Sequence, residues 1–212
     1  MLHTMALLIY LALIGWTLRT LPLKLLLQSG KTQHLVFGSS VCLFILWLFR
    51  TGIYPGLNVH FLWLSALPLV LGLRWAIISS FVSLIGLTAA GLESIDMFGI
   101  NGLLGCLVPI VVSYMIFSLA FHKLPRHLFI YIFVCAFAGG IVALTFKMLL
   151  MGGYYYLSGI YEWQIIVDNY LILTPLLLFP EGMLNGMTIT LLIIYLPGWV
   201  NTFYDKHYLY NK

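Results

Sequence analysis

The sequence has very little charge for its length. Only 8% of its 212 residues are Asp, Glu, Lys or Arg, whereas 62% are apolar. A soluble domain is typically about one quarter charged, and a chain of this size could not hide so many apolar side chains from water. A lipid bilayer solvates such a surface. The composition therefore excludes a soluble globular protein and predicts an all-α, polytopic helical membrane protein.

Several motifs that carry chemistry are also absent. The chain has no HExxH, GxSxG or Walker A motif, so the usual signs of a zinc hydrolase, a serine hydrolase and a nucleotide-driven motor are missing. It also lacks the Gly–Asp pair of intramembrane aspartyl proteases and the paired mid-span histidines of haem proteins. We therefore predict that the chain is not an enzyme and that it binds no permanent cofactor.

Cysteine and clustered positive charge are scarce too. Cys42, Cys106 and Cys135 each lie within an apolar run, without CxxC spacing, so we favour small packing residues over a disulfide or metal role. The net charge of +4 is spread along the chain, which argues against nucleic acid as a partner. The basic residues are better interpreted as markers of topology.

Apolar runs with short connectors fill the chain, which predicts a single transmembrane domain over residues 1–212, about seven helices in one bundle. The expected spans are Met5–Leu18, His34–Phe49, Leu57–Leu73, Trp75–Leu92, Phe98–Phe121, Leu128–Met151 and Gly182–Val200. Residues 152–163 form an aromatic cluster typical of a membrane–water interface. The stretch Ile165–Phe179 is short for a span, so we expect an interfacial or re-entrant segment before the last helix. If it crosses, there are eight spans.

The Lys and Arg residues indicate the orientation. Most of them fall in the first, third and fifth connectors and in the tail: Arg19, Lys24, Lys31, Arg74, Lys123, Arg126, Lys206 and Lys212. Arg50 alone lies in the second connector, and the fourth carries Glu93 and Asp96. Because basic residues concentrate on the cytoplasmic side, we expect an outside N-terminus and a cytoplasmic C-terminus in a bacterial cytoplasmic (inner) membrane. With eight spans, the tail would lie outside.

Polar residues inside apolar runs are the candidate site residues, because each is costly in lipid unless it faces protein or water. They are Asn58, His60, Asn101, Asp168, Asn169, Glu181 and Asn185. His60 opens the third run; histidine is the commonest metal ligand, but one near a helix end is more often simply hydrogen-bonded. For Lys147, deep in the sixth run, we favour snorkelling to the interface.

The N-terminus reads Met1-Leu2-His3. A free amine followed two residues later by His can wrap a metal with four nitrogens in a plane, which suits Cu(II) or Ni(II). Any His near a chain start has this form, so the pattern by itself is weak.

The segment Pro180–Gly186 is the strongest polar motif. Glu181 and Asn185 are four residues apart and share a helical face, as do Gly182 and Gly186, which would permit a close helix contact. We expect Pro180 to open the last helix and both polar side chains to face protein. A capped, packed helix start and a functional polar pocket both fit this pattern.

Three motifs resemble the CbiM-like permeases, the membrane substrate-capture subunits of energy-coupling-factor importers for cobalt and nickel. They are Gly56–Leu62, Gly99–Leu103 and Pro180–Gly182. Leu124–His127 and Leu177–Met187 are similar to a divergent bacterial branch known as energy-coupling factor ABC transporter permease. The resemblance covers about residues 50–199.

This resemblance implies a helical substrate-binding bundle with its N-terminus outside. In the family, the free amine and a His at position two chelate the metal, and a second His at the head of a later span completes the site. His60 matches the second His, whereas position two is Leu2 and the nearest His is His3. The implied metal site is thus Met1, His3 and His60. The residues expected to line or support it are Asn58, Asn101, Glu181 and Asn185.

The function implied is a permease subunit that captures a divalent metal ion, Co, Ni or Cu, as its cargo. Because the chain has no nucleotide motif, ATPase subunits and a coupling transmembrane subunit are the expected partners, beside the lipid bilayer. The alternative is a non-transport membrane protein, an assembly or metal-insertion factor on the same scaffold. Genes for ATPase and coupling subunits beside this one would separate the two.

The topology is testable with reporter fusions. We predict that a reporter after Lys212 and a reporter in the connector around Glu93 lie on opposite sides of the membrane, because the Lys and Arg distribution places them so. Finding both reporters on the same side would refute the predicted arrangement.

Overall fold

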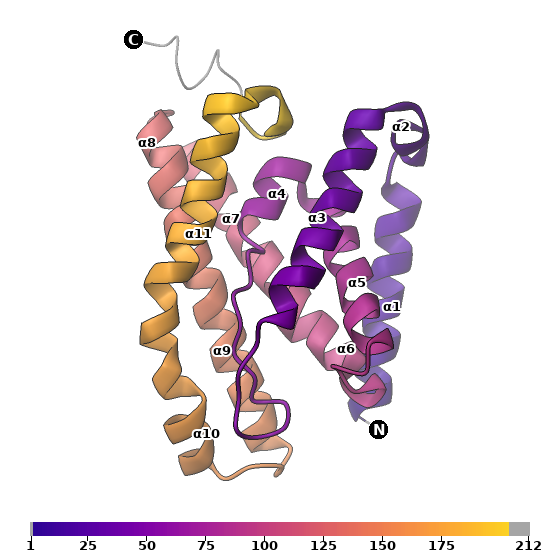
Figure 1. Ribbon diagram of the computed structural model, residues 1–212, viewed down its shortest axis with the longest axis vertical. Helices are drawn as coiled ribbons and strands as arrows, with labels where there is room; N and C mark the ends of the chain where they lie inside the picture. Colours follow the sequence, from indigo (N-terminus) through magenta and orange to yellow (C-terminus); the bar gives the residue numbers. More distant parts are fainter. Residues whose placement is uncertain (1, 204–212) are drawn as a thin grey trace.

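Long helices lie side by side in one bundle in the computed structural model, which describes residues 2–203 (Figure 1). The α-helices are α1 (Leu2–Thr20), α2 (Leu23–Gln28), α3 (Gly30–Leu48), α4 (Ala66–Leu71), α5 (Leu73–Ala89), α6 (Phe98–Ile100), α7 (Val108–Lys123), α8 (Leu128–Ile130), α9 (Gly139–Leu157), α10 (Trp163–Asn169) and α11 (Thr174–Tyr195). Short 3₁₀ segments are η1 (Ile95–Met97), η4 (Leu171–Leu173) and η5 (Pro197–Trp199), and π-helical segments are η2 (Asn101–Leu107) and η3 (Tyr131–Ala138). No strand occurs among the described residues, so the all-α prediction is confirmed.

Five helical stretches are long and apolar enough to cross a bilayer. They are Leu2–Thr20, Gly30–Leu48, Ile95–Lys123, Leu128–Leu157 and Trp163–Tyr195. The shorter apolar helix α5 lies between the second and the third of them. Large apolar side chains such as Leu8, Phe129 and Leu176 point outward and are exposed, which suits a surface solvated by lipid. The polytopic membrane architecture is therefore confirmed.

The expected span Leu57–Leu73 is wrong as a continuous helix. Residues 50–65 are non-helical apart from turns, and only α4 is helical in this part of the chain. A single antiparallel bridge joins Thr51 to Val59, with N···O distances of 3.0 and 2.8 Å. We call residues 50–65 the return segment. After α3 they lead to a loop at one end of the bundle and then, with α4, run back along the bundle to the start of α5 (Figure 1). Beside the five long stretches, α5 and the return segment with α4 also run along the bundle, so the predicted number of about seven spans is approximate.

The last helix begins earlier than expected. It starts at Thr174, and Pro180 lies inside it and not at its first turn. The stretch Ile165–Phe179 is divided among α10, η4 and the first turns of α11, which belong to one apolar stretch, Trp163–Tyr195. It is therefore not a separate crossing. The sixth expected span is too short, because α9 runs on to Leu157 and includes the first part of the aromatic cluster, which is partly buried.

The side chains of Glu181 and Asn185 hold the return segment and the start of α4. The Glu181 carboxylate accepts hydrogen bonds from the backbone N–H groups of Leu62 and Trp63, both at 2.8 Å. Asn185 Oδ1 accepts from the Ala66 N–H at 2.8 Å, and its Nδ2 donates to Glu181 Oε1 at 2.7 Å. Both side chains are fully buried. They face protein, as predicted, and replace the partners that a continuous helix would have given these backbone groups.

The glycines of the same motif bring α11 against its neighbour. A Cβ added to Gly182 would lie 3.0 Å from Ile141 Cγ1 and 3.0 Å from Phe137 Cδ2. No larger residue fits there without moving one of these side chains, so the predicted close helix contact is confirmed.

The cysteines are unpaired, as favoured from the sequence. Cys106 and Cys135 are buried and contribute to the core, whereas Cys42 is exposed on α3. The packing role thus holds for two of the three.

We expect Glu181→Gln to lower the thermal stability of the detergent-solubilised protein. A carboxamide cannot accept from both Leu62 and Trp63 without turning its own NH₂ toward a backbone N–H, which costs roughly 1–3 kcal/mol for a buried unsatisfied donor. Glu162→Gln is the matched control, because Glu162 is exposed and loses the same charge. Equal melting temperatures for the two variants would contradict the role assigned to Glu181.

Candidate functional site

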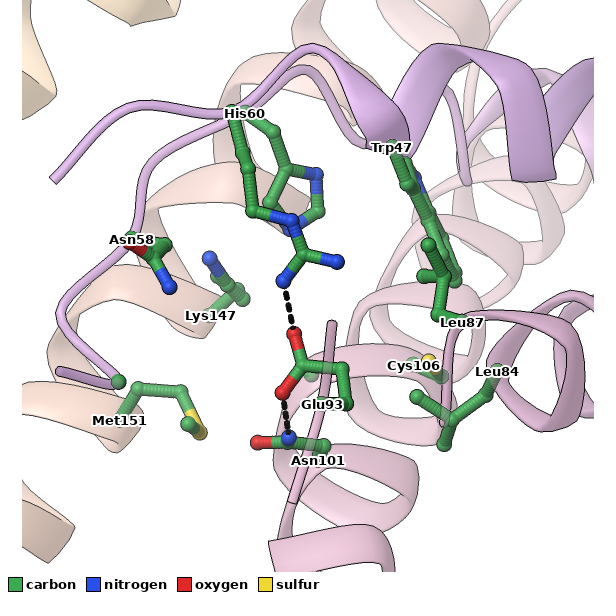
Figure 2. Close-up of a pocket in the computed structure, with 13 residues that line it drawn as sticks. Trp47, Asn58, His60, Leu84, Leu87, Glu93, Asn101, Cys106, Lys147 and Met151 are labelled. Atoms are coloured by element: carbon green, nitrogen blue, oxygen red, sulfur yellow. Dashed lines mark hydrogen bonds and ion pairs between the residues drawn. The ribbon is translucent and has the colours of Figure 1, made fainter. Parts of the chain in front are cut away.

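A small polar cavity of about 40 Å³ lies where the return segment meets α5, η2 and α9 (Figure 2). Its lining comprises Trp47, Arg50, Gly56, Asn58, His60, Leu84, Leu87, Glu93, Asn101, Gly105, Cys106, Lys147 and Met151. Three of the predicted site residues, Asn58, His60 and Asn101, are thus brought together in one place. A volume of this size suits an ion or a group of a few atoms.

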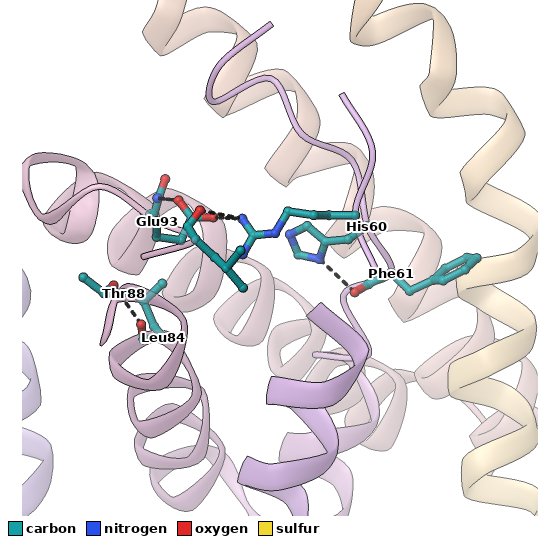
Figure 3. A network of polar contacts seen from close by, with 8 residues as sticks. His60, Phe61, Leu84, Thr88 and Glu93 are labelled. Atoms are coloured by element: carbon teal, nitrogen blue, oxygen red, sulfur yellow. Dashed lines mark hydrogen bonds and ion pairs between the residues drawn. The ribbon is translucent and has the colours of Figure 1, made fainter. Parts of the chain in front are cut away.

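Arg50, Glu93 and Asn101 form a chain of charged and polar contacts across this cavity (Figures 2 and 3). Glu93 Oε1 forms an ion pair with Arg50 Nη1, and Glu93 Oε2 accepts from Asn101 Nδ2 at 2.6 Å. Arg50 Nη1 also donates to the Leu92 carbonyl at 3.2 Å. The ion pair ties the return segment to the connector between α5 and η1.

The remaining donors of Arg50 are unsatisfied. Its Nε and Nη2 atoms are buried and have no hydrogen-bond partner, and the side chain as a whole is only 11% exposed. A buried guanidinium normally fills its five donor positions with acceptors. The cavity therefore contains donor capacity that residues 2–203 do not use.

Lys147 is buried in the same cavity, so the snorkelling interpretation is wrong. The residue is 5% exposed, and its Nζ lies 5.7 Å from the centroid of the Tyr170 ring. It has no hydrogen-bond acceptor among the described residues. Because α9 continues to Leu157, Lys147 is nearly three turns from the helix end, and its side chain lines the cavity that Asn58 also lines (Figure 2).

His60 presents one ring nitrogen to the cavity. Its Nδ1 lies 3.0 Å from the Phe61 carbonyl, which can only accept, so Nδ1 is the donor. A neutral imidazole with a proton on Nδ1 keeps its lone pair on Nε2, the form that binds metals. The ring also packs on Trp47, with 5.6 Å between centroids.

The structure places the other predicted residues elsewhere. Glu181 and Asn185 do not line the cavity but fix the backbone that directly follows His60. His3 Nε2 is hydrogen-bonded to Tyr154 Oη at 2.5 Å, and His3 is not part of the cavity lining. Met1 lies outside the described residues. Within residues 2–203, no three His, Cys, Asp or Glu side chains gather in a metal-binding arrangement.

Sequence reasoning missed the charged half of this site. Arg50 and Glu93 were interpreted only as topology markers, and Lys147 as a snorkelling residue. One signal could have found the ion pair: Arg50 is the single basic residue in its connector, and Glu93 lies in a connector predicted on the same side of the membrane. An isolated charge facing an opposite charge on one side of a bilayer favours pairing.

The comparisons with known proteins agree with this architecture. A family model described as cobalt uptake substrate-specific transmembrane region matches residues 2–199. A solved structure titled as a truncated transition metal transporter superposes with a TM-score of 0.69 at 18% sequence identity, covering 92% of this chain and 94% of the other. At that identity the likeness shows a shared fold. No curated protein matches the chain.

We expect the Arg50–Glu93 pair to show strong energetic coupling in a double-mutant cycle. Arg50→Leu and Glu93→Leu each leave a poorly exposed charge without its partner, whereas the double variant leaves none, so a coupling of roughly 1–3 kcal/mol should appear in thermal or denaturant unfolding. Arg74→Leu serves as the control, because Arg74 is exposed and donates to a backbone carbonyl. Additive effects of the two substitutions would show that the pair is not coupled.

Proposed function

Because the chain belongs to the CbiM family of cobalt uptake substrate-specific transmembrane proteins, we propose that it captures a divalent transition metal for import. The family match over residues 2–199, almost all of the described chain, carries this proposal. Cobalt and nickel are the metals proposed.

The site proposed for the metal is built around His60. Its Nε2 faces a small cavity and is not engaged by the described residues, so it is available as a ligand. The amine of Met1 and the imidazole of His3 are the further ligands proposed. Figure 1 supports the inclusion of His3, since the start of α1 lies at the same end of the bundle as the loop of the return segment. His3 would have to leave Tyr154 to reach His60.

The protein is proposed to act as one subunit of an energy-coupling-factor importer in a bacterial cytoplasmic membrane, with its N-terminus outside. ATPase subunits and a coupling transmembrane subunit would supply the energy, because the sequence contains no nucleotide-binding motif. Asn58 and Asn101, which line the cavity, and Glu181 and Asn185, which fix the segment after His60, would orient the site.

We expect His60→Ala to abolish binding of Ni(II) or Co(II) by the purified protein, measured by calorimetry and by metal content. An N-terminal extension that blocks the Met1 amine should weaken binding, and Asn58→Ala should have a smaller effect, because it changes only the surroundings of the ligand. His122→Ala is the control, because His122 is exposed and contacts the carbonyl of its own helix. Unchanged metal affinity in the His60 variant would rule out His60 as a ligand.

A further inference from the structure

The cavity holds more buried positive charge than negative charge. Arg50 and Lys147 both contribute cations, and Glu93 is the single carboxylate in the lining. Both oxygens of Glu93 are engaged, one by Arg50 and the other by Asn101. Glu181, the other acid nearby, is occupied by two backbone N–H groups and Asn185. Lys147 is therefore left without a hydrogen-bonded counter-charge among the described residues.

Two of the residues that line this cavity carry unsatisfied donors. Arg50 Nε and Nη2 are buried without acceptors, and Lys147, 5% exposed, lies over the Tyr170 ring and has no hydrogen-bond acceptor within residues 2–203. The Asn58 side chain is directed into the same region as the Lys147 ammonium (Figure 2). Buried cations without acceptors are costly, and a bare divalent cation would increase that cost by repulsion. An anion with acceptor oxygens would relieve it.

We propose that this cavity binds a carboxylate group between Arg50 and Lys147, and that the metal therefore arrives as a small carboxylate chelate. The second part rests on the proposed function. In such a complex the carboxylate satisfies the two cations while His60 Nε2 contributes a nitrogen to the metal. Guanidinium and ammonium donors both form strong charge-assisted hydrogen bonds with carboxylates. The volume of about 40 Å³ limits the ligand to one carboxylate group and a few further atoms.

Three probes test the proposal on the full-length protein in nanodiscs: Ni(II) without a carboxylate, acetate alone, and Ni(II) with glycine. We expect Ni(II) with glycine to bind at least about tenfold more tightly than Ni(II) alone, the gain that corresponds to one charge-assisted hydrogen bond. Lys147→Met should abolish that gain. Lys123→Met, which removes an exposed lysine at the end of α7, should keep it.

Asn58→Asp provides a second test that does not require removal of the lysine. A built-in carboxylate beside Lys147 should tighten the binding of Ni(II) alone and remove most of the benefit of glycine. If Ni(II) binds to the wild-type protein but glycine gives no gain, or if the gain persists in Lys147→Met, the carboxylate site is overturned.

The probes also separate this inference from the metal proposal. Acetate binding that depends on Lys147, without any binding of Ni(II), would support the carboxylate site with a free carboxylate as ligand and would count against metal capture. Ni(II) binding that ignores both glycine and Lys147 would overturn the carboxylate site and leave metal capture standing.

Discussion

The hydrogen bonds of the Glu181 and Asn185 side chains hold together the part of the structure on which the site depends. The return segment enters the bundle without forming a helix, so its backbone N–H groups need partners that lipid cannot provide. The Glu181 carboxylate accepts hydrogen bonds from the N–H groups of Leu62 and Trp63, and Asn185 accepts one from the N–H group of Ala66. The two side chains are also hydrogen-bonded to each other. They fix the inner end of the return segment, directly after His60, while the Arg50–Glu93 ion pair and the contact of Gly56 with Tyr155 of α9 hold its outer part.

This dependence gives the polar residues two separate tasks. The polar atoms of Glu181 and Asn185 already form hydrogen bonds with backbone groups and with each other, which leaves few of them to bind a ligand. Arg50, Lys147 and His60, in contrast, retain unused donors or a lone pair at the cavity. The division explains why the most conspicuous polar motif of the sequence is structural, whereas the residues with free capacity for chemistry lie scattered over the second connector, the return segment and the middle of α9.

The sequence predicted the elements that depend on long-range composition and missed those that depend on individual contacts. Long apolar runs predict spans because the bilayer thickness sets their length, and five of them correspond to long helices. The run Leu57–Leu73 has the same composition, but side chains from α11, more than 100 residues away, bind its backbone and prevent a continuous helix. No local pattern contains that information.

The same reason applies to the site. His60, Asn58 and Asn101 could be selected because polar residues in apolar runs are rare, and they do line one cavity. The burial of Lys147 could not be predicted, because it depends on where α9 ends and on which face of α9 packs against the rest of the bundle. Arg50 and Glu93 looked like ordinary connector charges because their pairing joins positions 43 residues apart.

The close contact at Gly182 also keeps lipid away from the polar side chains of Glu181 and Asn185. With Ile141 and Phe137 seated directly on the glycine, the seam between α11 and the η3–α9 helix is too tight for an acyl chain to enter. Glu181 and Asn185 are therefore screened by fixed protein dipoles whatever lipids surround the bundle. Their hydrogen bonds form in a protein interior of low dielectric constant, where each is stronger than in water. A side chain at position 182 would push α11 away from Ile141 and Phe137, and this displacement would lengthen the hydrogen bonds of Glu181 and Asn185 without touching any of their atoms.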